Sequence, residues 1–405
     1  MINLKNKIVR GSIILLLLVG LFNVLNFLYH VIMARALPIE EFGLLKRVFA
    51  FLYIGAIFME SIQTVVVKYA SSPEQDEGRL KNIFIRTTKG LLKPSIIVAM
   101  LFLLASLIIS PVLKIPYAIL FATTIFIIGS MFAPITRGIL QGQQRFWALG
   151  FSMLGEATFK IGASFLLVSF GFGVLGAVWG VVISIFLSLV LSLIYLRKIF
   201  KSKSSFAELG GIRSYSKPVF LVTLVLILFI NVDVLLSGYF FDQTNAGIYA
   251  IASTIGLIIF IGVQPVNKVL FPIAVNDSAI NNKSKTNFIM AIILISIICL
   301  IALSIIFLFT EKILYLLSNK VLPQAVTPTL IISMGTVFLS LSSSLLYYKL
   351  SQGKTSNYLW VSVFLLMEII LLCVFSQNLI SYSYAFLGSN IILFFGSFAI
   401  LRKKS

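Results

Sequence analysis

The residues of this 405-residue chain that could do chemistry are charged and polar side chains inside long apolar segments. Lys46, Tyr53 and Glu60 recur at intervals of seven, which places them along one side of a helix. At about 1.5 Å per residue, Lys46 and Glu60 are about 21 Å apart and cannot pair, so we expect them to line a common polar cavity. Arg47 lies beside Lys46. An alternative for these two cations is that they extend toward the membrane surface from the helix end.

Other ionisable residues interrupt apolar segments further along the chain. Glu156 and Lys160 are four residues apart with the acidic residue first, the favoured order for a helical ion pair. This pair could be functional, or it could simply neutralise itself. Asp233 and Glu368 are isolated acidic residues, and Asp233 could be hydrated from a nearby loop. Because a charge at mid-membrane costs about 2.5–3.5 kcal/mol on insertion scales, ionisable residues in such segments are functional candidates by default.

The segments that carry these residues are hydrophobic enough to cross a membrane. Hydrophobic residues make up 59% of the chain and charged residues 11%, with a mean hydropathy of +1.06. Lipid requires that the backbone polar groups be satisfied within each segment, which favours helices. A spanning helix needs about 20 mainly apolar residues, so we predict an all-α polytopic membrane protein with about twelve transmembrane helices. The predicted spans are 9–36, 43–70, 84–110, 116–137, 146–170, 174–197, 215–239, 245–273, 287–310, 322–350, 356–377 and 380–401.

The basic residues indicate which side of the membrane each loop faces. If the N-terminus is cytoplasmic, most of the 32 lysines and arginines fall on the cytoplasmic side of an even number of spans, Arg137 and Arg145 among them. This is the bias of the positive-inside rule, so we predict that both termini lie in the cytoplasm and that the membrane is the plasma or inner membrane. Topology and attraction to anionic membrane lipids account for the net charge of +19, and nucleic-acid binding is not expected.

The predicted spans divide into two halves of six. A loop rich in Lys, Ser and Gly separates them, so we predict an N-lobe at 1–197, a cytoplasmic linker at 198–214 and a C-lobe at 215–405. Because six is even, the lobes share one orientation and would be related by a pseudo-two-fold axis along the membrane normal. Such a repeat places a substrate site between the lobes and permits alternating access.

A shift of 204 residues brings polar residues of the two halves into register. Glu60 then lies over Gln264, and Gln63 lies over Asn267, while Lys268 extends the second polar face. We therefore expect matching polar faces on the second and eighth spans.

The loops limit the classes of chemistry that the chain can perform. None is long enough to fold as a domain, the chain has one histidine, and no Cys/His cluster has metal-ligand spacing. No nucleotide-binding motif is present either. We expect no metal and no cofactor, and transport driven by an ion gradient, the membrane potential or a substrate gradient.

Five motifs resemble those of one known family. They are MARALPIEEFG at 33–43, VKYA at 67–70, GILQGQQRF at 138–146, GFGVLGA at 171–177, and Asp233 followed by AGIY at 246–249. Together they resemble the polysaccharide-repeat (Wzx-type) flippases of the multidrug/oligosaccharidyl-lipid/polysaccharide exporter superfamily.

The resemblance implies two six-helix lobes around a central cavity and movement of a lipid-linked oligosaccharide from the inner to the outer leaflet. The carrier would be an undecaprenyl or dolichyl pyrophosphate, and glycan polymerase machinery is a further expected partner. A pyrophosphate would attract Lys and Arg, and acidic residues could couple H+ or Na+. The candidates for substrate binding are Arg35, Lys46, Arg47, Tyr53, Lys160, Gln264, Asn267 and Lys268, and those for ion coupling are Glu60, Glu156, Asp233 and Glu368.

Three other functions are alternatives to this one. A multidrug or organic-cation exporter of the same fold should have an acidic cavity without the basic residues of the second span. A membrane-bound glycan polymerase should carry a large outer loop with carboxylates, and the sequence has none. A non-transporting assembly scaffold would leave Glu60, Glu156 and Lys160 without a cavity to line.

Overall fold

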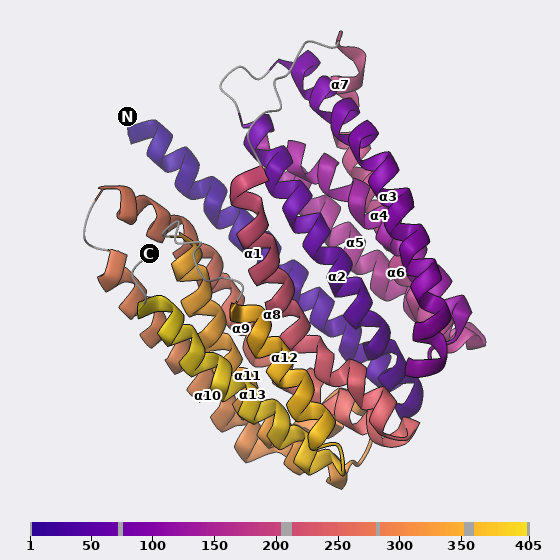
Figure 1. Ribbon diagram of the computed structural model, residues 1–405. Helices are drawn as coiled ribbons and strands as arrows, with labels where there is room; N and C mark the ends of the chain where they lie inside the picture. Colours follow the sequence, from indigo (N-terminus) through magenta and orange to yellow (C-terminus); the bar gives the residue numbers. More distant parts are fainter. Residues whose placement is uncertain (1, 72–75, 204–212, 281–283, 352–359, 403–405) are drawn as a thin grey trace. The chain divides into compact units, whose positions relative to one another are not determined.

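The computed structural model of the protein describes residues 2–71, 76–203, 213–280, 284–351 and 360–402, which contain helices and no strand (Figure 1). Each predicted span overlaps one long helix, so the all-helical prediction is confirmed. The first helices are α1 (Ile2–Ala36), α2 (Ile39–Ala70), α3 (Glu77–Leu113), α4 (Tyr117–Gly142), α5 (Phe146–Leu167), the π-helical turn η1 (Val168–Phe172), α6 (Gly173–Tyr195) and α7 (Arg197–Lys201). They are followed by α8 (Arg213–Phe240), α9 (Gln243–Ile280), α10 (Ser284–Ser318), α11 (Pro323–Ser351), α12 (Trp360–Val374) and α13 (Leu379–Arg402).

Helices long and apolar enough to cross a membrane dominate the described chain. Nine segments meet both conditions, and one of them, Phe146–Tyr195, runs through α5, η1 and α6. Apolar side chains on the outside of these helices are strongly exposed, for example Leu101 (61%), Leu104 (60%) and Ile108 (71%) on α3. Such a continuous apolar surface requires a cover of lipid. The protein is therefore a multi-pass membrane protein.

The chain forms two compact units. Unit 1 contains residues 1–37 and 51–216, and unit 2 contains residues 38–50 and 217–405. In unit 1, α6 packs against both α4 and α5, and α1 packs against α5. In unit 2, α11 packs against α9 and α13. The helix α2 is divided, because its first part belongs to unit 2 and the rest belongs to unit 1.

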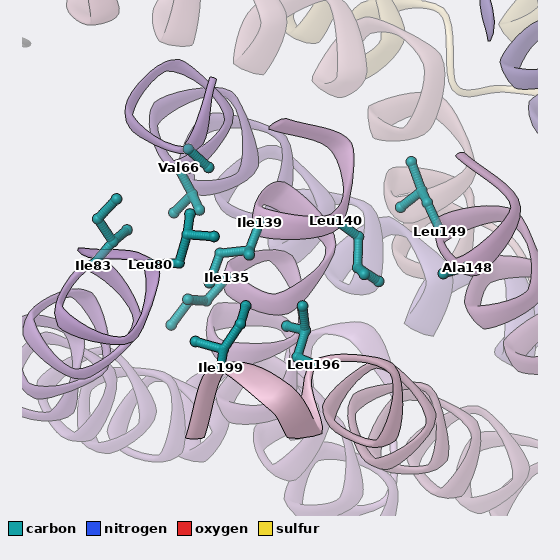
Figure 2. Close-up of a cluster of buried hydrophobic side chains, with 11 residues drawn as sticks. Val66, Leu80, Ile83, Ile135, Ile139, Leu140, Ala148, Leu149, Leu196 and Ile199 are labelled. Carbon is teal, nitrogen blue, oxygen red and sulfur yellow. The ribbon is translucent and has the colours of Figure 1, made fainter. Parts of the chain in front are cut away.

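A cluster of buried aliphatic side chains holds one end of unit 1 together (Figure 2). Val66 of α2, Leu80 of α3, Ile135 of α4, Leu149 of α5 and Ile199 of α7 meet in it. The short helix α7 is also tied to α3 by Lys81, whose Nζ donates to the carbonyl oxygens of residues 200 (3.0 Å) and 202 (2.9 Å). Apolar packing and the bonds from Lys81 thus fix this end of the unit.

Helices α5 and α6 are joined through η1. Gly171 (φ 87°) and Gly173 (φ 50°) have positive φ values, a region that side chains with a Cβ rarely adopt. The chain reverses direction at this turn, so that α6 packs on α5. At Gly180 the two helices are so close that a Cβ would overlap the backbone of Ser164. This close packing positions the polar residues of α5, described next, against α1, α4 and α6.

Candidate functional site

A buried lysine lies between two helices of unit 1. Lys160 of α5 is 6% exposed, and its Nζ donates to the side-chain oxygen of Asn26 on α1. The same ammonium group lies 4.8 Å from the centroid of the Tyr29 ring, a cation–π distance. Lys160 is therefore held in the interior with its charge directed at α1.

The carboxylate four residues before Lys160 pairs with a different cation. Glu156 forms an ion pair with Arg137 of α4, and Arg137 also donates to the hydroxyl of Ser188 on α6. The prediction had Glu156 pairing with Lys160 along one helix, and these two charges do interact electrostatically. Arg137 forms the direct ion pair with Glu156. Arg137, Lys160 and Glu156 together therefore carry two positive charges and one negative charge, a net charge of +1.

Arg137 is a residue that sequence reasoning missed, since it was assigned to the loop cations. The structure places it 4% exposed inside α4, which continues to Gly142. The sequence signal for a buried Arg137 is Gln141, one helical turn further along. The side-chain oxygen of Gln141 accepts a hydrogen bond from Gln63 of α2 (2.7 Å). Two polar residues at that spacing indicate that the helix, with an inward polar face, continues past the predicted end of the span.

The single histidine of the chain joins α1 to α2. His30 is 3% exposed, and its Nε2 lies 3.2 Å from the hydroxyl oxygen of Tyr53. Tyr53 is half-buried and lies just past the point at which α2 enters unit 1. Its role in substrate binding stays a prediction.

In unit 2, Asp233 joins three helices. It is fully buried on α8, and its Oδ2 accepts a hydrogen bond from the hydroxyl of Tyr249 on α9 (2.9 Å). Its backbone carbonyl accepts a second bond from Tyr382 of α13 (2.7 Å). The two tyrosine rings meet edge to face, with centroids 5.0 Å apart. Asp233 is therefore enclosed by protein, contrary to the expectation that a loop could hydrate it.

A second buried carboxylate faces Asp233. Glu368 of α12 is 0% exposed, and neither of its carboxylate oxygens has a hydrogen-bond partner among the described residues. The neighbouring Ser389 hydroxyl donates instead to the carbonyl oxygen of Phe386 (2.8 Å). Glu368 and Asp233 interact electrostatically, and Oδ1 of Asp233 also lacks a partner in the described part of the chain. Two buried carboxylates with orphan oxygens form a carboxylate pair that is suited to a proton or a small cation.

The first part of α2 brings two cations into unit 2. Lys46 is 4% exposed and Arg47 is 2% exposed, so both are buried and neither extends to the surface. Arg47 packs across Gly238 of α8, where a Cβ would overlap its side chain. Lys46 interacts electrostatically with Asp233.

A glycine pair sets the distance between α2 and α9. A Cβ at Gly43 would lie 2.7 Å from the Cα of Gly247, and one at Gly247 would overlap the backbone of Ile39. Glu40 adds a hydrogen bond from Thr244 (2.8 Å). Because the obstacles are backbone atoms, the two helices can cross this closely only with glycine at both positions.

The glycine crossing predicts a specific stability defect. Gly43→Ala should lower the free energy of unfolding by about 1–3 kcal/mol, because the added methyl group forces α2 away from α9. The change is measurable as the melting temperature of the purified protein. Gly262→Ala is the matched control on α9, since no atom lies within 4 Å of its would-be Cβ. Equal melting temperatures for the two variants would contradict this account.

The remaining predicted residues lie outside these clusters. Arg35 and Glu60 are exposed. Gln264 is half-buried, and its Nε2 has no hydrogen-bond partner among the described residues. Asn267, 3% exposed, faces Ser343 of α11 (3.4 Å). The side chain of Lys268 is outside the part that the structure describes.

The helical architecture of the chain matches that of solved membrane transporters. It is similar to a multidrug resistance MATE family transporter of the MOP superfamily in an inward-facing conformation (TM-score 0.72, 13% identity, 95% of this chain and 96% of that one). It is also similar to the lipid II flippase MurJ in an inward closed conformation (TM-score 0.72, 15% identity, 96% and 88%). A third similar structure is a MOP superfamily transporter from Pyrococcus furiosus (TM-score 0.65, 16% identity, 99% and 97%).

The chain is a polytopic membrane protein whose helical fold is similar to that of these solved structures. The family profile described as "Polysaccharide biosynthesis protein" matches residues 8–276, which is more than half of the chain. The chain belongs to this polysaccharide biosynthesis family. No curated protein matches it significantly. The two solved structures named first are a transporter and a flippase, and their fold is the one that the sequence predicted.

Proposed function

We propose that the protein moves a lipid-linked oligosaccharide, carried on a polyprenyl (pyro)phosphate, from the inner to the outer leaflet for cell-surface polysaccharide biosynthesis. The observation that carries this proposal is the set of buried cations, Lys46 and Arg47 in unit 2 and Arg137 and Lys160 in unit 1. An organic-cation exporter would not place lysine and arginine in its interior, whereas a phosphate-bearing substrate is attracted to them.

The proposed topology has twelve spans and both termini in the cytoplasm. Nine segments qualify alone, Phe146–Tyr195 counts as two helices, and the shorter apolar helices Leu224–Phe240 and Trp360–Val374 complete the set. Six spans would belong to the N-lobe (1–197) and six to the C-lobe (215–405), which would move by alternating access. The polar contacts support the repeat. Gln63 of α2 is hydrogen-bonded to α4, the fourth long helix of the first half, and Asn267 of α9 faces α11, the fourth long helix of the second half.

Coupling to an ion is assigned to the Asp233–Glu368 carboxylate pair of unit 2. Asp233 and Glu368 offer orphan oxygens in a protein interior, where a proton or Na+ would satisfy them. Glu156 is committed to Arg137 and Glu60 is exposed, so these two predicted coupling residues are weaker candidates. An undecaprenyl or dolichyl carrier and glycan polymerase machinery are the partners that this function would require.

The function can be tested in proteoliposomes that contain the purified protein. A fluorescent polyprenyl-pyrophosphate oligosaccharide is incorporated in the vesicles, and the fraction accessible to a membrane-impermeant quencher is followed with time. We expect faster exchange between leaflets than in protein-free vesicles, and slower exchange with Lys160→Ala. Uptake of a fluorescent organic cation is measured in parallel. Cation transport without exchange of the glycolipid would overturn the proposal in favour of a drug exporter.

A further inference from the structure

The ammonium group of Lys160 is held in the interior of unit 1 by groups that carry no net charge. A buried lysine is ordinarily paired with a carboxylate. The carboxylate one helical turn away, that of Glu156, forms its ion pair with Arg137 instead. Within the described part of the chain, Lys160 has the side-chain oxygen of Asn26 as its hydrogen-bond acceptor and the Tyr29 ring at 4.8 Å. Its charge is therefore stabilised without a direct counter-ion.

Both of these partners on α1 are fixed in orientation by hydrogen bonds of their own. Asn26 and Tyr29 are three residues apart and share a face of α1. The Asn26 amide nitrogen donates to the carbonyl oxygen of Phe22 (2.8 Å), which leaves the amide oxygen for Lys160. The Tyr29 hydroxyl donates to the carbonyl oxygen of Ala177 on α6 (3.3 Å), which holds the ring. The ammonium group thus meets an oxygen and a ring face that are both held in place.

The cluster formed by Arg137, Glu156 and Lys160 also has unused hydrogen-bond donors. Arg137 is 4% exposed, and its Nε has no hydrogen-bond partner among the described residues. An ammonium group has three N–H donors, and Asn26 accepts from one of those of Lys160. A net positive charge with spare N–H donors in a protein interior is complementary to an anion with several acceptor oxygens, and a phosphate group has this chemistry.

We propose that Asn26 and Tyr29 are positioning residues that hold Lys160 as a charged ligand for a phosphate or pyrophosphate group, which in the proposed substrate is linked to the lipid. They supply a neutral oxygen and a neutral ring where a carboxylate would cancel the charge. This inference rests on the proposed function and adds to it the two residues that keep the buried lysine available for an anion. A carboxylate in place of the Asn26 amide should then stabilise the protein and weaken anion binding, a combination that a purely structural role for Asn26 would not produce.

The test measures anion binding by the purified full chain in detergent, followed as the shift of its melting temperature. The probes are farnesyl pyrophosphate and inorganic pyrophosphate, and farnesol is the uncharged control. We expect Asn26→Asp to bind pyrophosphate about tenfold or more weakly than the wild type, because the new carboxylate pairs directly with Lys160. Without ligand, its melting temperature should equal or exceed that of the wild type. Tighter binding of farnesyl pyrophosphate than of inorganic pyrophosphate would identify a lipid-linked anion, and equal binding a free one; both would support the anion site.

Three further variants separate the effect from net charge and from loss of folding. Asn378→Asp makes the same chemical change at an exposed position of unit 2, where the carboxylate can still accept the hydrogen bond from the backbone N–H of Ser381. It should keep wild-type affinity. Tyr29→Phe retains the ring and should also keep wild-type affinity, whereas Tyr29→Leu removes the ring face and should bind pyrophosphate several-fold more weakly. This second pair tests the inference even where Asn26→Asp is poorly folded.

Wild-type affinity in Asn26→Asp, an equal loss in Asn378→Asp, or an equal loss in Tyr29→Phe and Tyr29→Leu would overturn the inference. Binding of farnesol as tight as that of farnesyl pyrophosphate would also overturn it. Because glycolipid exchange is measured separately in proteoliposomes, these results would leave the proposed function standing. A wild-type protein that does not exchange the glycolipid would instead contradict the proposed function itself.

Discussion

Glu156→Ala is expected to lower the free energy of unfolding by about 3–5 kcal/mol, the largest stability loss of any single change considered for unit 1. The side chains of Arg137 and Glu156 are 5% and 13% exposed. Removing the carboxylate leaves Arg137 buried without its counter-ion, close to the positive charge of Lys160. Thermal or denaturant unfolding of the purified protein measures the loss.

The size of this effect depends on the charge left behind and not on the loss of one contact. The double variant Arg137→Met/Glu156→Leu should therefore recover most of the stability, since replacing both members of a buried ion pair with apolar residues is often neutral. Glu60→Ala is the matched control, an exposed acidic residue in the same unit, and should change stability by less than about 0.5 kcal/mol. A double variant that is less stable than Glu156→Ala would show that the pair stabilises the fold directly.

Asp233→Asn is expected to reduce cation-dependent translocation at least tenfold while leaving the fold intact. Asparagine has the same shape, and its amide oxygen can still accept the hydrogen bond from Tyr249, but it cannot bind a proton or Na+ as a carboxylate does. Glu368→Gln should have the same effect, because the two buried carboxylates interact and would share one cation. The measurement is the initial rate of glycolipid exchange in proteoliposomes with and without an imposed Na+ or pH gradient.

The control for this second prediction is Glu311→Gln, which neutralises an exposed carboxylate on α10 of the same unit. It should leave the response to the gradient unchanged. If Asp233→Asn responds to the gradient as the wild type does, the carboxylate pair is not the coupling site. If Glu311→Gln loses glycolipid exchange together with Asp233→Asn, the loss results from the change in net charge and not from the carboxylate pair.

The helices could be predicted from the sequence because membrane spans leave a strong local signal. The run of apolar residues in α5 begins at Phe146 both by prediction and in the structure. Ionisable residues inside the apolar segments, such as Asp233, Glu368 and Lys160, could be identified because burying a charge is costly wherever it occurs. All three are buried.

The partners of these residues could not be predicted, because they depend on which helix faces which. Hydropathy gives the same value for Glu60, which is exposed, as for Glu368, which is enclosed. Helical spacing suggested that Glu156 pairs with Lys160, but α4 supplies Arg137 from another part of the sequence. The division of α2 between two units was also hidden, since the helix is continuous in sequence and in hydropathy.

The charge partnership in unit 2 has a consequence for how the protein is made. Lys46 and Arg47 leave the ribosome with α2, whereas Asp233 follows 187 residues later (233 minus 46) and Glu368 later still. At about 5–20 residues per second, Lys46 and Arg47 are made roughly 10–40 s before Asp233. During synthesis its two cations must therefore be hydrated, or shielded by the insertion machinery or by lipid phosphates. Final seating of this segment is a late event of biogenesis, although it belongs to one of the first helices to enter the membrane.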